Sequence, residues 1–305
     1  MSKKVNKAAA VTRSGFVAVA GRPNAGKSTL INALVGHHIA IVSPIAQTTR
    51  RVVRAALTTD TSQIVFVDLP GSQKPVDRLT TRMQHAVTSS LVDVDAVLWV
   101  IDGRDEPKGG ERIVADMVFA SGKPVVVALN KIDGLAPVSI MQRIEQITQI
   151  IGEREYAALV PISALNGDGI ERVTEELTPL LPEGAAWFSD DTPTDMRDDE
   201  RISEYVREAT LSYLKEELPH ATIVEVDEMF DNDEGKLHIE CTIWVETKSQ
   251  AGIIVGKGGS MIVQIGTDAR KRIQTEFGRK VYLHLRAKVR KNWRDDDTQL
   301  SRWGL

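Results

Sequence analysis

Residues 21–28 read Gly21-Arg22-Pro23-Asn24-Ala25-Gly26-Lys27-Ser28, the pattern G-x-x-x-x-G-K-[ST]. The apolar run 15–20 before them predicts a strand, and 29–35 after them favours a helix. A glycine-rich turn between a strand and a helix points successive backbone N–H groups at phosphate oxygens. The stretch therefore predicts a phosphate-binding loop in which Lys27 reaches the outer phosphates and the Ser28 hydroxyl ligates Mg²⁺.

Outward from this loop, strand-like runs alternate with helical patterns up to about residue 181. The expected strands are 51–57, 63–67, 96–101, 124–129 and 158–162, and the expected helices lie near 79–91, 110–121, 137–150 and 169–180. Such alternation predicts an α/β fold, with a mostly parallel six-stranded sheet and helices on both faces. The nearly continuous apolar strands also suit a sheet that is covered on both sides.

Four polar motifs follow expected strands directly, at 21–28, 68–71, 130–133 and 163–165. Ligands of open α/β sheets bind beyond the carboxyl ends of the strands. Because all four motifs fall at that edge, we expect them to form one site.

Asp68-Leu69-Pro70-Gly71 matches the D-x-x-G pattern. An aspartate at this position holds Mg²⁺ in phosphate-loop enzymes. Gly71 has no Cβ, so its N–H can approach a γ-phosphate closely. We expect Asp68 to hold the metal with Ser28, and Gly71 to contact the phosphate.

Asn130-Lys131-Ile132-Asp133 matches N-K-x-D. A carboxylate only accepts hydrogen bonds, and guanine offers two adjacent donors where adenine does not. A buried Asp133 would therefore reject adenine, whose binding would leave its lone pairs unpaired. Ser163, Ala164 and Leu165 are expected to close this pocket with backbone N–H groups near the guanine oxygen.

A second unit begins after a stretch rich in proline, glycine and acids. We expect an N-terminal arm at 1–13, a first domain at 14–181, a linker at 182–200, a second domain at 201–294 and a tail at 295–305. The second domain shows the order helix, strand, strand, helix, helix, strand. This pattern predicts a smaller α+β domain.

The second domain contains Gly256-Lys257-Gly258-Gly259, a G-x-x-G loop between two short helical runs. In one class of nucleic-acid-binding domain this loop clamps a single strand of about four nucleotides. Ile253 and Ile254 would form a wall of the groove, and Arg270 and Arg272 its basic edge. The stretch 270–294 contains ten Lys or Arg residues and one acid, Glu276, although a solvated basic helix would read the same way.

Overall composition sets limits on partners and compartment. The 305 residues carry a formal net charge of −4, so nucleic-acid contact must come from a local basic patch. The one cysteine, Cys241, allows no disulfide within the chain, which fits a cytoplasmic location. No run of 18 apolar residues predicts a membrane span, and no signal peptide is expected.

Together these motifs resemble the TRAFAC-class GTPases, and the bacterial Era family in particular. The resemblance rests on Gly21–Ser28, Thr48-Thr49-Arg50, Asp68–Gly71, Asn130–Asp133 and Ser163–Leu165, and continues through the second domain, which is similar to a type II KH fold. It implies a monomeric P-loop GTPase that binds GTP or GDP with Mg²⁺. The implied nucleotide contacts are Gly21, Arg22, Pro23, Asn24, Ala25, Gly26, Lys27, Ser28, Thr29, Asp68, Leu69, Pro70, Gly71, Asn130, Lys131, Asp133, Ser163, Ala164 and Leu165.

By the same resemblance, Thr49 completes the Mg²⁺ shell, with Thr48 as the second choice, and Lys27, Gly71 and Thr49 serve catalysis. Ser72 and Gln73 follow the D-x-x-G motif where Ras-type enzymes place a water-orienting glutamine directly after the glycine. Ser72 and Leu69 also depart from the usual Era residues, so we name no water-positioning side chain and expect slow intrinsic hydrolysis. Asn24 either holds a K⁺ ion against the phosphates or caps the loop.

The resemblance implies binding near the 3′ end of small-subunit (16S) ribosomal RNA, through the KH domain, during assembly of the 30S subunit. An alternative is a regulatory GTPase on the inner face of the cell membrane, held by the basic residues and controlling growth or division. A third interpretation keeps the KH domain and makes the nucleotide site structural.

Overall fold

The computed structural model shows two compact units. The first contains the described residues of Met1–Ala40, Val52–Ser72 and Gln84–Asp195, and the second those of Ile41–Arg51, Gln73–Met83 and Met196–Leu305. The structure describes residues 12–43, 45, 48–70, 75–107, 109–189, 191–215, 217–233 and 235–305.

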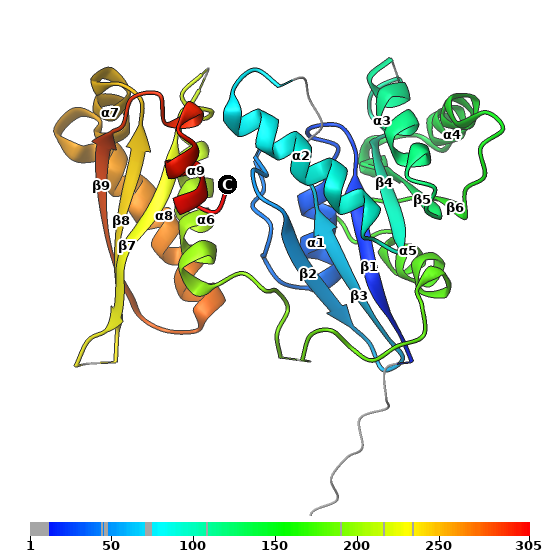
Figure 1. The fold of residues 1–305 in the computed structure, drawn as a ribbon, viewed down its shortest axis with the longest axis horizontal. Helices are drawn as coiled ribbons and strands as arrows, with labels where there is room; N and C mark the ends of the chain where they lie inside the picture. Colours follow the sequence, from blue (N-terminus) through cyan, green and yellow to red (C-terminus); the bar gives the residue numbers. More distant parts are fainter. Residues whose placement is uncertain are drawn as a thin grey trace, which may run out of the picture. The chain divides into compact units, whose positions relative to one another are not determined.

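The first unit is built on a six-stranded sheet with the order β2-β3-β1-β4-β5-β6 (Figure 1). β2 runs antiparallel to β3, and the other neighbours are parallel, as the alternating pattern predicts. β4 and β5 are almost wholly buried, which explains their continuous apolar sequences. The strands are β1 (Arg13–Ala20), β2 (Val53–Thr58), β3 (Ser62–Asp68), β4 (Ala96–Asp102), β5 (Val125–Asn130) and β6 (Ala158–Pro161).

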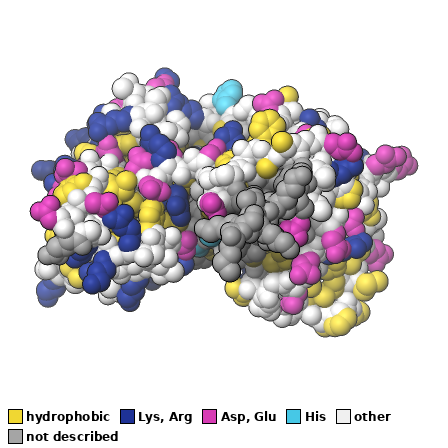
Figure 2. All heavy atoms as spheres, turned by 90° about the horizontal axis from the view of Figure 1, so that it is seen from below, with side chains coloured by type: hydrophobic (Ala, Val, Ile, Leu, Met, Phe, Trp, Pro, Cys, Tyr) yellow, Lys and Arg dark blue, Asp and Glu magenta, His cyan; other side chains and the backbone are white. Residues whose placement is uncertain are grey.

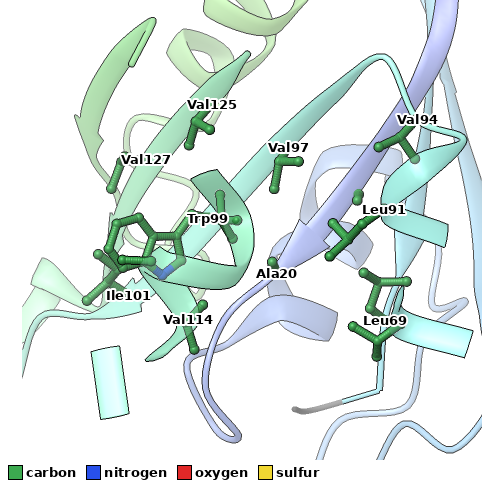
Figure 3. Close-up of a cluster of buried hydrophobic side chains, with 14 of the residues drawn as sticks. Ala20, Leu69, Leu91, Val94, Val97, Trp99, Ile101, Val114, Val125 and Val127 are labelled. Atoms are coloured by element: carbon green, nitrogen blue, oxygen red, sulfur yellow. The ribbon is translucent and has the colours of Figure 1, made fainter. Parts of the chain in front are cut away.

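Helices cover both faces of this sheet. Alternate residues of β1, β4 and β5 pack with α2, α3 and α4 in one apolar cluster on one face, where Trp99 lies among aliphatic side chains (Figure 3). α1 and α5 lie on the other face (Figure 1). The helices are α1 (Lys27–Val35), α2 (Arg78–Val92), α3 (Gly109–Ala120), α4 (Pro137–Ile151) and α5 (Ile170–Leu177), with 3₁₀ turns at Ile132–Gly134 and Thr178–Leu180.

Part of the expected linker pairs with the edge strand β2. The Ala56 N–H donates to the Pro193 carbonyl at 2.8 Å, and the Thr194 hydroxyl donates to the Arg54 carbonyl at 2.7 Å. Gln63 accepts hydrogen bonds from the N–H groups of Trp187 and Phe188. The first unit therefore extends to Asp195, and its edge strand is covered.

The second unit has the α-β-β-α-α-β order expected of a KH domain. Its sheet has the order β7-β8-β9, with β7 antiparallel and β9 parallel to β8. Apolar residues of β8 pack against α6 and α8. The elements are α6 (Asp198–Leu211), β7 (Ile223–Asp231), β8 (Leu237–Val245), α7 (Lys248–Val255), α8 (Ser260–Phe277), β9 (Val281–Val289) and α9 (Asp297–Arg302), with 3₁₀ turns at Lys257–Gly259 and Trp293–Asp295.

The segment Ile41–Arg51 is anchored in this second unit by Arg50. The Arg50 side chain is buried and donates hydrogen bonds to the carbonyls of Thr222 (2.6 Å), Pro219 (2.9 Å) and His220 (3.0 Å). Its guanidinium lies 5.7 Å from the centre of the Trp293 ring. Burial and the neighbouring Arg207 lower the pKa of Arg50 to about 9, so it remains charged at neutral pH.

The segment Gln73–Met83 also packs with the second unit, through a small apolar cluster. Leu79 and Met83 of α2 meet Trp293, Leu300 and Trp303 there. The expected C-terminal tail thus forms α9 and supplies core residues. Among the described helices, none is long and apolar enough to cross a membrane.

Candidate functional site

The phosphate loop joins β1 to α1 and is shaped by its glycines. Gly26 has φ 95°, and a Cβ there would lie 2.2 Å from the Asn130 side-chain nitrogen, so only glycine fits. Lys27, 7% exposed, donates to the Gly21 and Arg22 carbonyls, both at 3.0 Å. Burial lowers the pKa of Lys27, while Asp68 and Glu111 act to raise it. The loop therefore wraps around a buried amine at the N-terminus of a helix.

Ser28 and Asp68 lie together beside the loop. The Ser28 hydroxyl donates to Asp68 Oδ2 at 3.0 Å, and Asp68 is fully buried at the end of β3. A hydroxyl and a carboxylate are the hard oxygen ligands that Mg²⁺ prefers, so this pair fits the expected metal. Thr49 lies in the segment Ile41–Arg51 of the second unit. Gly71, Ser72 and Gln73 lie outside the described residues.

Asn130 joins the phosphate loop to the other expected nucleotide-binding segments. Its amide nitrogen donates to the Ala25 carbonyl at 2.9 Å, and its oxygen accepts from the Ala164 N–H at 2.9 Å. Lys131 has φ 66° and extends across the loop, where it donates to the Asn24 carbonyl and to Asp102 Oδ2. The motifs at 21–28, 130–131 and 163–165 are thus one hydrogen-bonded assembly.

Asp133 lies at the far end of this assembly. Its Oδ1 accepts a hydrogen bond of 2.8 Å from the Ser163 hydroxyl, which orients the carboxylate. We expected a buried Asp133, but the structure shows it exposed in the chain by itself. Selection of guanine by Asp133 requires its carboxylate to be shielded from water. In this site the bound base itself would have to provide that shielding.

In the second unit, the G-x-x-G loop is a tight turn between α7 and α8. Gly256, Gly258 and Gly259 all have positive φ, at 72°, 61° and 82°. A Cβ at Gly256 would lie 2.8 Å from the Met261 backbone nitrogen, so this position requires glycine. Lys257 is exposed at the tip of the turn.

The apolar wall beside this turn differs from our expectation at one residue. Ile253 is 51% exposed and Val263 67% exposed, so both lie at the surface beside the turn. Ile254 is fully buried in the core of the unit, because neighbouring residues of a helix face different directions. Ile254 therefore supports the groove from inside rather than lining it.

The basic stretch 270–294 is partly neutralised within the unit. Among the described residues, ion pairs join Arg279 to Asp231, Arg286 to Glu240, and Arg290 to Asp296. Arg270 and Arg272 are exposed on α8, where Arg272 also pairs with Glu276 at 4.0 Å. On the face of the second unit that Figure 2 shows, Lys and Arg side chains are numerous.

The sequence interpretation missed two carboxylates next to the phosphate loop. Asp102 pairs with Lys131 at 2.7 Å. Burial acts to raise the pKa of Asp102, but hydrogen bonds from Arg104 and Lys131 together lower it. Glu111, 3% exposed, lies with its Oε1 3.7 Å from Arg22. Asp102 could have been noticed as a polar strand end, whereas Glu111 carries no sequence signal that distinguishes it from a solvated helix residue.

Comparisons with known proteins agree with this geometry. A family model described as a 50S ribosome-binding GTPase matches residues 16–131, and a KH-domain model matches residues 217–294. A structure of an Era variant from Aquifex aeolicus bound to GDP·AlF₄⁻ is 34% identical, covers 96% of this chain and 99% of its own, and has a TM-score of 0.91. A structure of Era in complex with MgGDPNP and nucleotides 1506–1542 of 16S ribosomal RNA gives the same four values.

Proposed function

Because this chain belongs to the Era family of GTPases, we propose that it is a GTP-driven switch acting on small-subunit ribosomal RNA. Its KH domain would bind the RNA near the 3′ end, and the complex would assist assembly of the 30S subunit. The observation that carries the proposal is the presence, in one chain, of a phosphate loop and a G-x-x-G turn. The Era relative of the same architecture is bound to a 16S ribosomal RNA fragment.

Residue roles in the nucleotide site follow from the geometry. The loop N–H groups and Lys27 bind the phosphates, and the dipole of α1 adds to their positive field. Ser28 and Asp68 hold Mg²⁺, and the family resemblance implies Thr49 as a further ligand. The metal neutralises charge that develops on the phosphate oxygens. Asp133 selects guanine, since its carboxylate accepts from the two donors of that base.

We propose that this site speeds hydrolysis by stabilising the negative charge that develops on the phosphate oxygens. Lys27 and the loop amides bind the transferring phosphate, and the Gly71 N–H contributes by resemblance. A K⁺ ion on Asn24, whose backbone has φ 64°, would add positive charge. If so, replacing K⁺ by Na⁺ should slow turnover in the wild type. Asn24→Ala should remove that difference without abolishing GDP binding.

The RNA groove is formed by the turn 256–259 and the surface beside it. The three glycines of this turn have no Cβ, so a nucleic-acid strand can lie close against its backbone. Exposed Ile253 and Val263 would offer apolar contact, and the exposed Lys257, Arg270 and Arg272 would bind the phosphates of the RNA backbone. Backbone contacts of this kind give affinity that falls with salt.

Sedimentation of the protein with ribosomal particles tests this proposal. We expect the GTP-bound chain to migrate with small subunits, and Lys257→Asp to abolish migration. Lys215→Asp, with the same charge change at an exposed position of the second unit, is the matched control and should migrate normally. Equal migration of the wild type and both variants would contradict an RNA contact through the G-x-x-G turn.

In the membrane alternative, the same basic residues would bind a lipid bilayer instead of RNA. Exposed Lys and Arg side chains also attract anionic lipids. RNA-independent binding of the monomeric protein to anionic vesicles, with no migration on small subunits, would favour a membrane-associated regulator. We propose a cytoplasmic protein, for which vesicle binding is absent or lost at physiological salt.

A further inference from the structure

Glu111 at the start of α3 is tied to the phosphate loop through Arg22. Its Oε1 lies 3.7 Å from Arg22 Nη1, and the carboxylate is 3% exposed. The adjacent Gly110 makes room for this contact, because a Cβ there would lie 2.8 Å from Arg22 Nε. The Arg22 guanidinium thus lies along the first turn of α3 and connects the loop backbone to a buried acid.

The surroundings of Glu111 only partly compensate its charge. Arg22 of the loop and Lys27 of α1 favour the charged form, whereas Asp102 at the end of β4 opposes it. The Trp99 indole N–H also favours the ionised form of Glu111. Among the described residues, however, Trp99 Nε1 and Glu111 Oε2 each lack a well-formed hydrogen bond. Burial outweighs these contributions and raises the pKa of Glu111 to about 7.

We propose that Glu111 positions the phosphate loop through Arg22 and takes up a proton when the phosphates of a nucleotide enter the loop. The proton comes from solvent and converts the carboxylate to a carboxylic acid. The inference rests on the proposed assignment of residues 21–28 to the phosphates. It makes Glu111 a positioning residue that couples nucleotide affinity to pH.

The physical reason is competition for the same cations. Bound phosphates bring negative charge next to Arg22 and Lys27, the two groups that favour ionised Glu111. A like charge nearby disfavours a carboxylate, so Glu111 binds a proton more tightly in the complex. By linkage, uptake of one proton makes affinity fall by up to about tenfold for each pH unit above neutrality. Asp68, which acts on Lys27 from β3, is present in both states and leaves this direction unchanged.

Calorimetry of GDP binding at pH 6, 7 and 8 tests the proposal. At each pH the titration is repeated in two buffers that differ in ionisation enthalpy. The dependence of the heat on the buffer gives the number of protons taken up. We expect Glu111 to take up at most about half a proton at pH 7, and less at pH 6, where it is already largely protonated in the free protein. Because the terminal phosphate of GDP also titrates, at about pH 6, the readout is the difference between the wild type and Glu111→Gln.

Glu111→Gln imitates the protonated acid, so it should lose this uptake and bind GDP at pH 8 at least as tightly as the wild type. Asp116→Asn, at an exposed side chain of the same helix, should retain the wild-type uptake. Equal uptake by the wild type and Glu111→Gln would overturn the proposal, as would loss of GDP binding in Glu111→Gln. Lys27→Ala tests the loop assignment separately, since normal GDP binding by that variant would refute the site itself.

Discussion

Replacing the buried Glu111 by glutamine should stabilise the first unit, by an amount that depends on pH. Burial raises the pKa of Glu111 from 4.5 to about 7. A shift of one pKa unit corresponds to about 1.4 kcal/mol of free energy, so ionised Glu111 lowers the free energy of unfolding by about 3 kcal/mol. Glutamine has the same shape and no charge, so the variant avoids this cost.

The direction of this change with pH follows from proton binding by Glu111 in the folded and the unfolded state. Between pH 4.5 and 7 the folded protein keeps the Glu111 proton and the unfolded chain releases it. Wild-type stability therefore decreases as pH rises through this window and is constant above it. The difference between Glu111→Gln and the wild type should grow from near zero at pH 4.5 to about 3 kcal/mol at pH 8.

Urea unfolding of the nucleotide-free full chain, followed by circular dichroism from pH 4.5 to 8, measures this difference. Added GDP in a parallel sample should identify the transition of the first unit, because ligand binding stabilises only the unit that holds the ligand. Asp116→Asn is the matched control and should show no such pH dependence. A difference between Glu111→Gln and the wild type that is the same at every pH would refute the reasoning.

Three further outcomes are expected. Asp133→Ala should weaken GDP binding at least tenfold in calorimetry, because the two guanine donors lose their acceptor. The ratio of GDP affinity to ADP affinity should also fall. An unchanged ratio would show that Asp133 does not select the base. Arg50→Met should lower the free energy of unfolding of the second unit by about 2–4 kcal/mol in urea, since the carbonyls between Pro219 and Thr222 lose a charged donor; a change below about 0.5 kcal/mol would show that this anchor is not stabilising. Burial raises the pKa of the Cys241 thiol, so the folded protein should resist aromatic disulfide reagents that label it rapidly in urea, and fast labelling of the folded chain would contradict its burial.

The sequence predicts the first sheet, and the meeting of the motifs at 21–28, 130–131 and 163–165, for a physical reason. Buried parallel strands must be apolar along their whole length, and the loop 21–28 admits few residue types because Gly26 packs against Asn130. The KH order is equally visible, since its strands alternate and its helices are amphipathic. These features depend on local pattern, which a sequence displays directly.

Contacts between distant residues could not be read in the same way. The side-chain contact between Arg22 and Glu111 and the burial of Arg50 depend on where separate elements meet. Ile254 carries the same apolar signal as Ile253, and only the orientation of α7 decides which one is buried. The pairing of Pro193 with β2 likewise joins a polar stretch to an edge that the sequence does not reveal.

The central claim is that the first unit binds guanine nucleotides in preference to adenine nucleotides. Calorimetric titration of the purified chain with GDP and with ADP, in the presence of Mg²⁺, tests it most directly. The account predicts saturable binding of GDP, ADP binding weaker by at least a hundredfold, and loss of GDP binding in Lys27→Ala. Equal affinity for ADP, or no heat with GDP, would contradict it.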